Sequence, residues 1–492
     1  MVVPSGVKKM VVVAMASSII APHFGRRKLT TVSASLSSRL VPRPLDLVSW
    51  VRREGGFVHQ SLRIGSGGHS STGLDLIASE EISSGSDLIR LPTHLPLSFD
   101  PPESARDGSH ALLIELASKV PALAEELWAL KLGLRLLQER ATVGSFWWPY
   151  ISNLPEAFST PIFFSGDEIK NLQYAPIVHQ VNKRCRFLLD FEKVVKQTLE
   201  DVSFRNHPFR GQDVDASALG WAMAAVSTRA FRLHGKALPH GSKSDIPMLL
   251  PLIDMCNHSF EPNAEIIQEQ DNKSPEAIVK VVSKEQIQRG YSVLLNYGDL
   301  CNDLLLLDYG FVIPENPYDT IELKYDGVLL DAASMAAGLQ SPNFSSPTPW
   351  QDDLLRLLNL EGDGADLKVT LGGPDVVDGR LLAAIRILLG NDKDVVEKHN
   401  LSTLQLLSTK APLGLSNEIF TLRTLIALCV IALGHFPTKI MEDESLLKGT
   451  ISSSMKLAIQ FRLRKKTLIS DVMRELTRKV NTLSNEKGAN SA

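Results

Sequence analysis

Two β-like regions of the sequence are separated by a long helical stretch, and this arrangement limits the possible folds more than any other feature. Residues 57–99 and 267–295 contain short apolar runs separated by turn-forming residues. Between about residues 110 and 232, apolar residues recur every three or four positions, as in amphipathic helices. Short strands of this kind predict small sheets rather than βαβ units. We therefore expect an α+β fold whose sheet region is split by a helical insert.

The C-terminal third of the sequence has a mainly helical pattern. A chain of 492 residues is too long for one hydrophobic core, because single cores stop growing at about 250–300 residues. Residues 362–379 are rich in Gly and Asp and predict a linker or a long loop. Helical patterns follow over residues 381–389, 417–433 and 456–480. We therefore expect a second, all-α domain.

The last of these helices combines an apolar stripe with basic residues. Leu457, Phe461 and Leu468 lie on the stripe, and four basic residues stand between them: Arg462, Arg464, Lys465 and Lys466. Charged residues on an amphipathic helix usually lie on its solvated face. We expect the stripe to face the core and the basic residues to face solvent.

Charge and cysteine content exclude several classes of protein. The net charge is −3 and the pI is about 6.5, so a nucleic acid is not expected as a direct partner. The four cysteines form no Cys-x-x-Cys pair and have no histidine at zinc-finger spacing, so we expect neither a metal site nor a disulfide scaffold. The apolar run over residues 419–433 contains Arg423, which favours a buried helix over a membrane span. The oligomeric state is left open.

The first 44 residues have the composition of an organellar transit peptide. They contain no Asp or Glu, seven basic residues and a Ser/Thr-rich stretch. We expect import into the chloroplast stroma, with the mitochondrion as the alternative. An apolar run over residues 10–21 makes a secretory signal the competitor, but it is shorter than the roughly 20 residues that span a bilayer. A tail without a targeting role is the other alternative.

Two motif clusters near the second β-like region carry the chemistry. Residues 250–259 read Leu-Pro-Leu-Ile-Asp-Met-Cys-Asn-His-Ser. Residues 294–298 read Leu-Leu-Asn-Tyr-Gly, and residues 304–311 read Leu-Leu-Leu-Leu-Asp-Tyr-Gly-Phe. Together they resemble the closing motifs of SET-domain methyltransferases, in the branch typified by the Rubisco large-subunit lysine methyltransferase. The resemblance implies a SET fold, in which small β-sheets surround a pseudo-knot that few other folds contain.

Further segments resemble the same branch and extend the resemblance over residues 44–483. They are the opening strand Gly73–Ala78, the aromatic loop Phe146–Tyr150 and the segment Thr228–Phe231 that ends the insert. The implied domains are a SET domain over residues 45–319, with its insert at about 100–232, and a helical substrate-binding domain over residues 320–492. The implied activity is S-adenosylmethionine-dependent methylation of a lysine side chain. Cys-rich zinc modules of histone-directed relatives are missing, which favours a non-histone and organellar protein substrate.

The resemblance also assigns roles to individual residues. Tyr297 matches the catalytic tyrosine, whose hydroxyl orients the methyl group and the incoming amine. Residues expected to bind the cofactor are Thr72, Gly73, Leu74, Arg229, Asn257 and His258. Residues expected to bind the substrate lysine are Asp254, Tyr309 and Phe311. The lysine must arrive neutral, so its pKa of about 10.4 has to fall in an apolar channel beside a cationic sulfonium.

Asp75 departs from the Gly-x-Gly pattern of this branch. An aspartate adds bulk and charge where the backbone approaches the cofactor, so we expect it to weaken cofactor binding. The alternative function is therefore a catalytically weak or inactive SET-like scaffold subunit of a plastid assembly. A helical interaction protein is a further non-enzyme alternative. A dinucleotide site at residues 65–68 is not expected, because no helix pattern follows those glycines.

Overall fold

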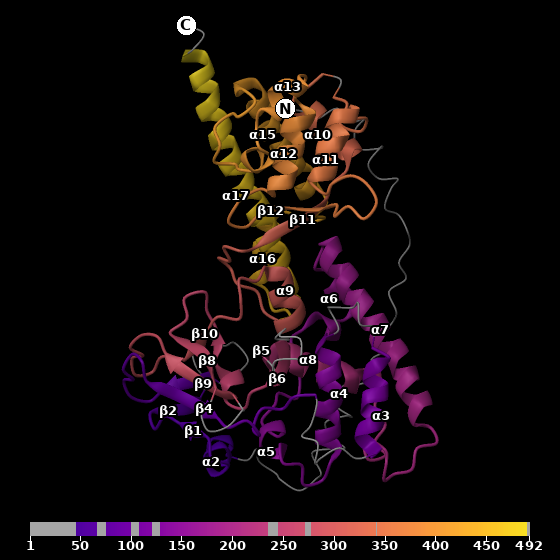
Figure 1. Ribbon diagram of the computed structural model, residues 1–492, viewed down its shortest axis with the longest axis vertical. Coiled ribbons are helices and arrows are strands. Elements are labelled where there is room, and N and C mark those ends of the chain that lie inside the picture. The colour runs from indigo at the N-terminus through magenta and orange to yellow at the C-terminus, as the bar shows by residue number, and fades with distance from the viewer. Residues whose placement is uncertain are drawn as a thin grey trace.

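The two β-like regions and the helices between them form one half of the molecule, and the C-terminal helices form the other (Figure 1). The computed structural model describes residues 46–65, 75–99, 108–120, 128–234, 245–270, 277–340 and 342–489. The predicted transit peptide over residues 1–44 and the proposed cofactor-binding residues Thr72, Gly73 and Leu74 lie outside these ranges.

The main sheet is completed across the helical insert, as expected from the sequence. Its four antiparallel strands have the order β1-β4-β9-β8. Strands β1 (Phe57–Val58) and β4 (Asp87–Leu91) precede the insert, whereas β8 (Ala264–Gln270) and β9 (Ala277–Ser283) follow it. In the central pair, Ile89 of β4 lies opposite Val281 of β9, and both side chains are fully buried. The sheet therefore joins segments almost two hundred residues apart in the sequence.

Three strand pairs surround the two motif clusters. Strand β2 (Leu62–Gly65) pairs with β3 (Asp75–Ala78), and β5 (Ala230–His234) pairs with β6 (Asp245–Leu249), both antiparallel. Strand β7 (Asn257–His258) pairs in parallel with β10 (Leu294–Leu295). The last pair places the Asn-His-Ser motif directly beside the strand that leads into Tyr297.

Helices of the insert cover the site from one side. Its main elements are α3 (Gly108–Ser118), α4 (Trp128–Ala141), α7 (Ala175–Leu199) and α8 (Ala216–Arg229), with shorter segments α5 (Trp148–Ile151), η5 (Pro161–Phe163) and α6 (Gly166–Lys170). Helix α8 begins where the Asp215 carboxylate accepts the Ala218 N–H at 2.8 Å. It packs closely on α4, since a Cβ at Gly133 would lie 3.2 Å from the Ala222 backbone. Its last residue, Arg229, leads directly into β5.

The C-terminal half is helical, as expected. It contains α10 (Gly327–Ala336), α11 (Pro349–Leu357), α12 (Gly379–Leu388), α13 (Lys393–Glu397), α14 (Leu401–Leu404), α15 (Leu415–Gly434), α16 (Ile440–Leu447) and α17 (Ser453–Ala489). It also contains a strand pair that the sequence pattern does not reveal. Strand β11 (Thr320–Lys324) pairs with β12 (Lys368–Gly372), so the expected linker over residues 362–379 is partly a strand. Within the described ranges, α15 is long and apolar enough to cross a membrane, but it packs on α10 and α17, as expected for a core helix.

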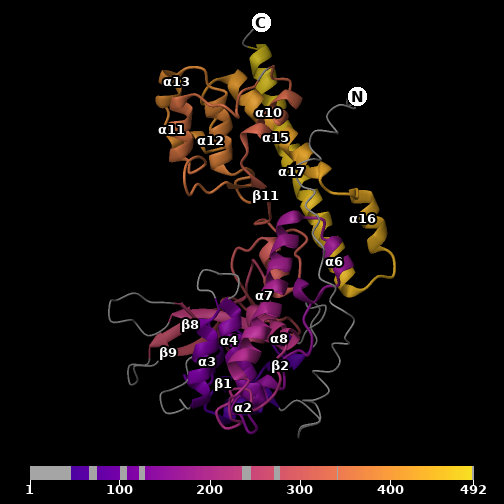
Figure 2. The same cartoon turned by 90° about the vertical axis from the view of Figure 1, so that its right-hand side faces the viewer.

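The expectation that the basic residues of α17 face solvent is wrong for three of the four. Arg462, Lys465 and Lys466 are buried, and Arg464 is half-buried. Their physical environment explains the difference: α17 extends from the C-terminal helices down to the insert, where α6 and α16 lie beside it (Figures 1 and 2). Carboxylates from these surroundings pair with the three cations, as buried charges require.

Candidate active site

Tyr297 joins the two motif clusters through hydrogen bonds. Its hydroxyl donates to the Cys256 carbonyl oxygen at 2.6 Å, and its backbone N–H donates to His258 Nδ1 at 3.1 Å. Burial is the largest effect that raises the pKa of Tyr297 above its usual value of about 10, and the nearby Cys256 and Tyr309 raise it further. The phenol therefore stays protonated at neutral pH and is a hydrogen-bond donor rather than a base.

An aromatic wall extends from Tyr297. Tyr309 stacks on it with ring centroids 5.2 Å apart, and Phe311 meets Tyr309 edge-on at 6.1 Å. Phe231 packs edge-on against Tyr297 from β5 at 6.1 Å. Burial, and to a smaller extent the negative charge of Asp308, raises the pKa of Tyr309 to about 12. The structure thus brings together the three aromatic residues named from the sequence and adds Phe231.

Tyr309 ends a short π-helix, η7 (Leu305–Tyr309), whose position is fixed by the insert. Gly310 follows with φ +76°, and a Cβ there would lie only 2.6 Å from Ser159 Oγ. Arg184 of α7 forms an ion pair with Asp308 at 2.7 Å. The glycine of the Asp-Tyr-Gly-Phe motif therefore permits both the left-handed turn and the close approach of Ser159 and Thr160 of the insert.

A buried polar cluster lies next to the Asn-His-Ser motif. Asp254 Oδ2 accepts from Arg229 Nη1 at 3.0 Å and from the Tyr150 hydroxyl at 2.8 Å. Burial raises the pKa of Asp254, whereas the charge of Arg229 opposes this effect. Arg229, expected to bind the cofactor, thus neutralises the residue expected to bind the substrate. Tyr150 belongs to the aromatic loop noted in the sequence, but no sequence signal indicates that it reaches Asp254.

Asp75 is bonded to the Asn-His-Ser motif. Its side chain is fully buried, accepting from Asn257 Nδ2 and from Ser292 Oγ, the latter at 3.2 Å. Strand β3 therefore holds the side chain of Asn257 through Asp75. The carboxylate satisfies two buried donors, which gives it a role in ordering the site.

Three buried side-chain atoms of the site have no hydrogen-bond partner in the part of the chain that the structure describes. They are His258 Nε2, Arg229 Nε and Asp254 Oδ1. Because His258 Nδ1 accepts the Tyr297 N–H, and burial lowers the pKa of His258, the neutral ring carries its proton on Nε2. The site thus offers two donors, on His258 and Arg229, and one carboxylate oxygen as acceptor, which fits a ligand bearing both hydrogen-bond acceptors and donors. Among the described residues, no group of three His, Cys, Asp or Glu side chains is placed to hold a metal ion.

The chain is similar to known methyltransferases in sequence and in fold. The family model described as Rubisco LSMT substrate-binding matches residues 342–469. The actin-histidine N-methyltransferases of Plecturocebus moloch and Homo sapiens are each 24% identical over 474 residues, covering 91% of this chain and 71% of each relative. The crystal structure of the SET domain of LSMT bound to lysine and AdoHcy superposes with a TM-score of 0.61 and 19% identity, covering 89% of this chain and 92% of that one.

The fold is therefore that of the SET domain, split by a helical insert and followed by a helical C-terminal region. This confirms the fold class expected from the two motif clusters. The expected residue roles and domain boundaries stay predictions, although the family match lies within the predicted C-terminal domain.

Proposed function

We propose that the chain is an S-adenosylmethionine-dependent protein methyltransferase that acts on a side-chain nitrogen. One observation carries the proposal: the Tyr297 hydroxyl is anchored on the Cys256 carbonyl where the two motifs meet, at the end of an aromatic wall. The curated relatives named above are protein methyltransferases, and solved structures of similar fold bind AdoMet or AdoHcy.

Cofactor binding is assigned to the edge of the site formed by β7 and β10. Asn257 and His258 would hold the cofactor there, together with Thr72, Gly73 and Leu74, which precede β3 in the sequence. Once bound, the cofactor supplies an electrophilic methyl group on a sulfonium. The Tyr297 hydroxyl and neighbouring carbonyl oxygens are suited to orient that methyl group by weak C–H···O contacts.

The acceptor nitrogen would enter along Tyr309 and Phe311. Apolar surroundings disfavour a charged amine, so the channel itself promotes loss of the lysine proton. Asp254 would set the position of the acceptor, with Arg229 and Tyr150 fixing the carboxylate. Lysine is our first candidate. Histidine is the second, because the curated relatives named above methylate actin histidine, and a neutral imidazole needs no such pKa shift.

A transfer assay distinguishes these candidates. The chain is incubated with radiolabelled S-adenosylmethionine and, separately, with purified actin, purified Rubisco or a chloroplast stromal extract, and labelled peptides are sequenced by mass spectrometry. Label on lysine supports the first candidate, and label on histidine supports the second. If calorimetry detects no binding of S-adenosylmethionine at millimolar concentration, the scaffold alternative replaces the proposal.

A further inference from the structure

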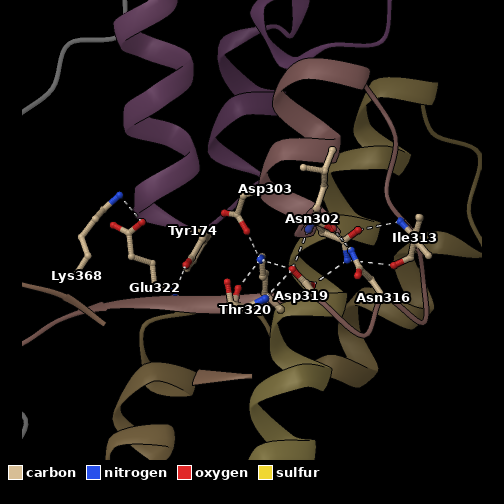
Figure 3. Close-up of polar contacts among 11 residues, drawn as sticks. Tyr174, Asn302, Asp303, Ile313, Asn316, Asp319, Thr320, Glu322 and Lys368 are labelled. Carbon is tan, nitrogen blue, oxygen red and sulfur yellow. Dashed lines mark hydrogen bonds and ion pairs between the residues drawn. The ribbon is translucent and has the colours of Figure 1, made fainter. Parts of the chain in front are cut away.

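Lys465 of α17 is buried at the junction of the two halves of the molecule. Its ammonium group forms an ion pair with Asp303 and donates to Asp319 Oδ1 at 2.8 Å and to the Thr320 carbonyl oxygen at 2.7 Å. Asp303, Asp319 and Thr320 converge in Figure 3. Burial alone would lower the pKa of Lys465, but the charges of Asp303 and Asp319 raise it, so the cation persists.

One of these carboxylates, Asp319, holds the base of a closed loop. Asp319 accepts from the backbone N–H of Asn302 at 3.0 Å and from its Nδ2 at 2.9 Å. The Asn302 side chain in turn bonds both backbone groups of Ile313, at 2.9 Å and 3.1 Å. These contacts, visible in Figure 3, close residues 302–313 into a loop. Lys465, Asp303, Asp319 and Asn302 are here called the clasp.

The loop over residues 302–313 carries Tyr309 and Phe311. Tyr309 stacks on Tyr297, so the position of the loop sets the position of the aromatic wall beside Tyr297. Lys465 lies within the segment matched by the substrate-binding family model, residues 342–469. The clasp thus connects the C-terminal region to the channel wall through a short series of buried contacts.

We infer that Lys465 is a positioning residue that couples the C-terminal region to the acceptor channel. A displacement of α17 is transmitted through Asp303, Asp319 and Asn302 to Tyr309 and Phe311. Docking of a protein substrate on the C-terminal region therefore adjusts the channel that receives its side chain. The expected effect on methyl transfer rests on the proposed function, whereas the coupling between α17 and residues 302–313 does not.

Lys466 is a matched control for Lys465. It is the next residue of α17, is equally buried, and forms an ion pair with Asp443. Its ammonium group also donates to the Thr438 carbonyl oxygen at 2.8 Å. All of these bonds lie within residues 438–466, so a Lys466→Met variant removes a buried cation without touching the clasp.

The test compares Lys465→Met and Lys466→Met in the full chain by hydrogen–deuterium exchange. Lys465→Met should raise amide exchange over residues 302–313 about tenfold or more, with little change over residues 438–448. Lys466→Met should show the reverse pattern. Equal exchange of residues 302–313 in the two variants overturns the inference, whether or not methyl transfer has been detected.

Two further measurements complete the test. Asp303→Asn keeps the contacts between Lys465 and Asp319, and it should raise exchange at the same place by a smaller factor even if Lys465→Met does not fold. Affinity for S-adenosylhomocysteine should stay within about threefold of wild type in Lys465→Met, because β7 and β10 are not part of the clasp. The kcat of methyl transfer is measured with the acceptor, actin or Rubisco, that becomes labelled. It should fall about tenfold in Lys465→Met and stay unchanged in Lys466→Met. If Lys465→Met lowers only the affinity for S-adenosylhomocysteine and leaves exchange and kcat unchanged, the coupling of α17 to residues 302–313 is contradicted.

Discussion

Tyr297 combines a half-buried ring with a hydroxyl whose partner is a backbone carbonyl rather than a charged group. Such a hydroxyl is held in one orientation and cannot ionise near neutral pH. Its contribution should therefore appear mainly in the transition state, where the methyl group and the acceptor nitrogen must be aligned.

Replacing Tyr297 with Phe should separate catalysis from binding. The ring and its packing remain, and the lost hydrogen bond costs about 0.5–1.5 kcal/mol of folding free energy. Turnover should fall roughly a hundredfold, about 2.7 kcal/mol in barrier, while cofactor affinity changes little. Wild-type turnover should show no loss from phenol ionisation between about pH 7 and 9, because burial raises the pKa of Tyr297. Radiolabel transfer and calorimetry measure these effects, and equal turnover in both proteins would refute the assigned role.

The sequence context of Asp75 suggests that its side chain weakens cofactor binding, whereas its hydrogen bonds suggest that removing the side chain weakens binding. Asp75→Gly leaves the buried donors of Asn257 and Ser292 without their acceptor. Calorimetry should show weaker binding of S-adenosylmethionine, by about 1–3 kcal/mol, the usual cost of unsatisfied buried groups. Asp75→Asn, which keeps one accepting oxygen, should lose less. Tighter binding by the glycine variant would instead support a relic site.

Helix α17 has the sequence of an amphipathic surface helix, but it connects the C-terminal half of the molecule to the SET half. Arg462 forms an ion pair with Asp443 and donates to both oxygens of Asn171, at 2.8 Å and 2.6 Å. Asn171 follows α6 in the insert, so this one guanidinium joins the C-terminal half to the SET half. Its burial makes the contact costly to break, since Asp443 would lose one of its two cationic partners and both Asn171 oxygens would lose their donor.

Arg462→Met should lower the free energy of unfolding by about 3–5 kcal/mol. Arg464→Met, two residues away on the same helix but half-buried, should change it by less than about 0.5 kcal/mol. Urea denaturation of the two variants beside wild type measures both values. If both variants lose a similar free energy of unfolding, the buried contacts of Arg462 do not stabilise the fold more than those of Arg464.

Local patterns predicted the elements better than they predicted the contacts between them. Helices α12, α15 and α17 follow from 3.6-residue periodicity, and the SET fold follows from the motif resemblance. Strand β12 was missed because its five residues lie within a Gly- and Asp-rich stretch. Periodicity also cannot show that both sides of α17 are covered.

The missed site contacts join residues far apart in the sequence. Tyr150 lies 104 positions from Asp254, and Asp75 lies 182 positions from Asn257. A single sequence contains no signal for such pairs, because each side chain reads as an ordinary aromatic or acidic residue at its own position. Phe231 stands in a recognised motif, but only the structure places it against Tyr297.

For the molecule as a whole, we propose that residues 1–44 direct import into the chloroplast, where the protein substrate would be found. A fusion of residues 1–60 to a fluorescent protein should accumulate in the stroma of plant cells. A fusion in which Arg26, Arg27 and Lys28 are replaced by Glu should stay outside, because transit peptides are poor in acidic residues. Purely cytosolic or secreted fluorescence of the unaltered fusion would reject the proposal.

The pairing of β4 with β9 also has a consequence for biosynthesis. Asp87 lies opposite Val282, so 195 residues separate partners in the central strands of the main sheet. At about 5–20 residues per second, a ribosome needs roughly 10–40 s to make that interval. During this time β4 lacks β9 and can pair only with the two-residue strand β1, while the helices of the insert can form locally. Substitutions that loosen the contact of α4 with α8 should therefore reduce the yield of soluble protein more than the activity of the molecules that complete folding.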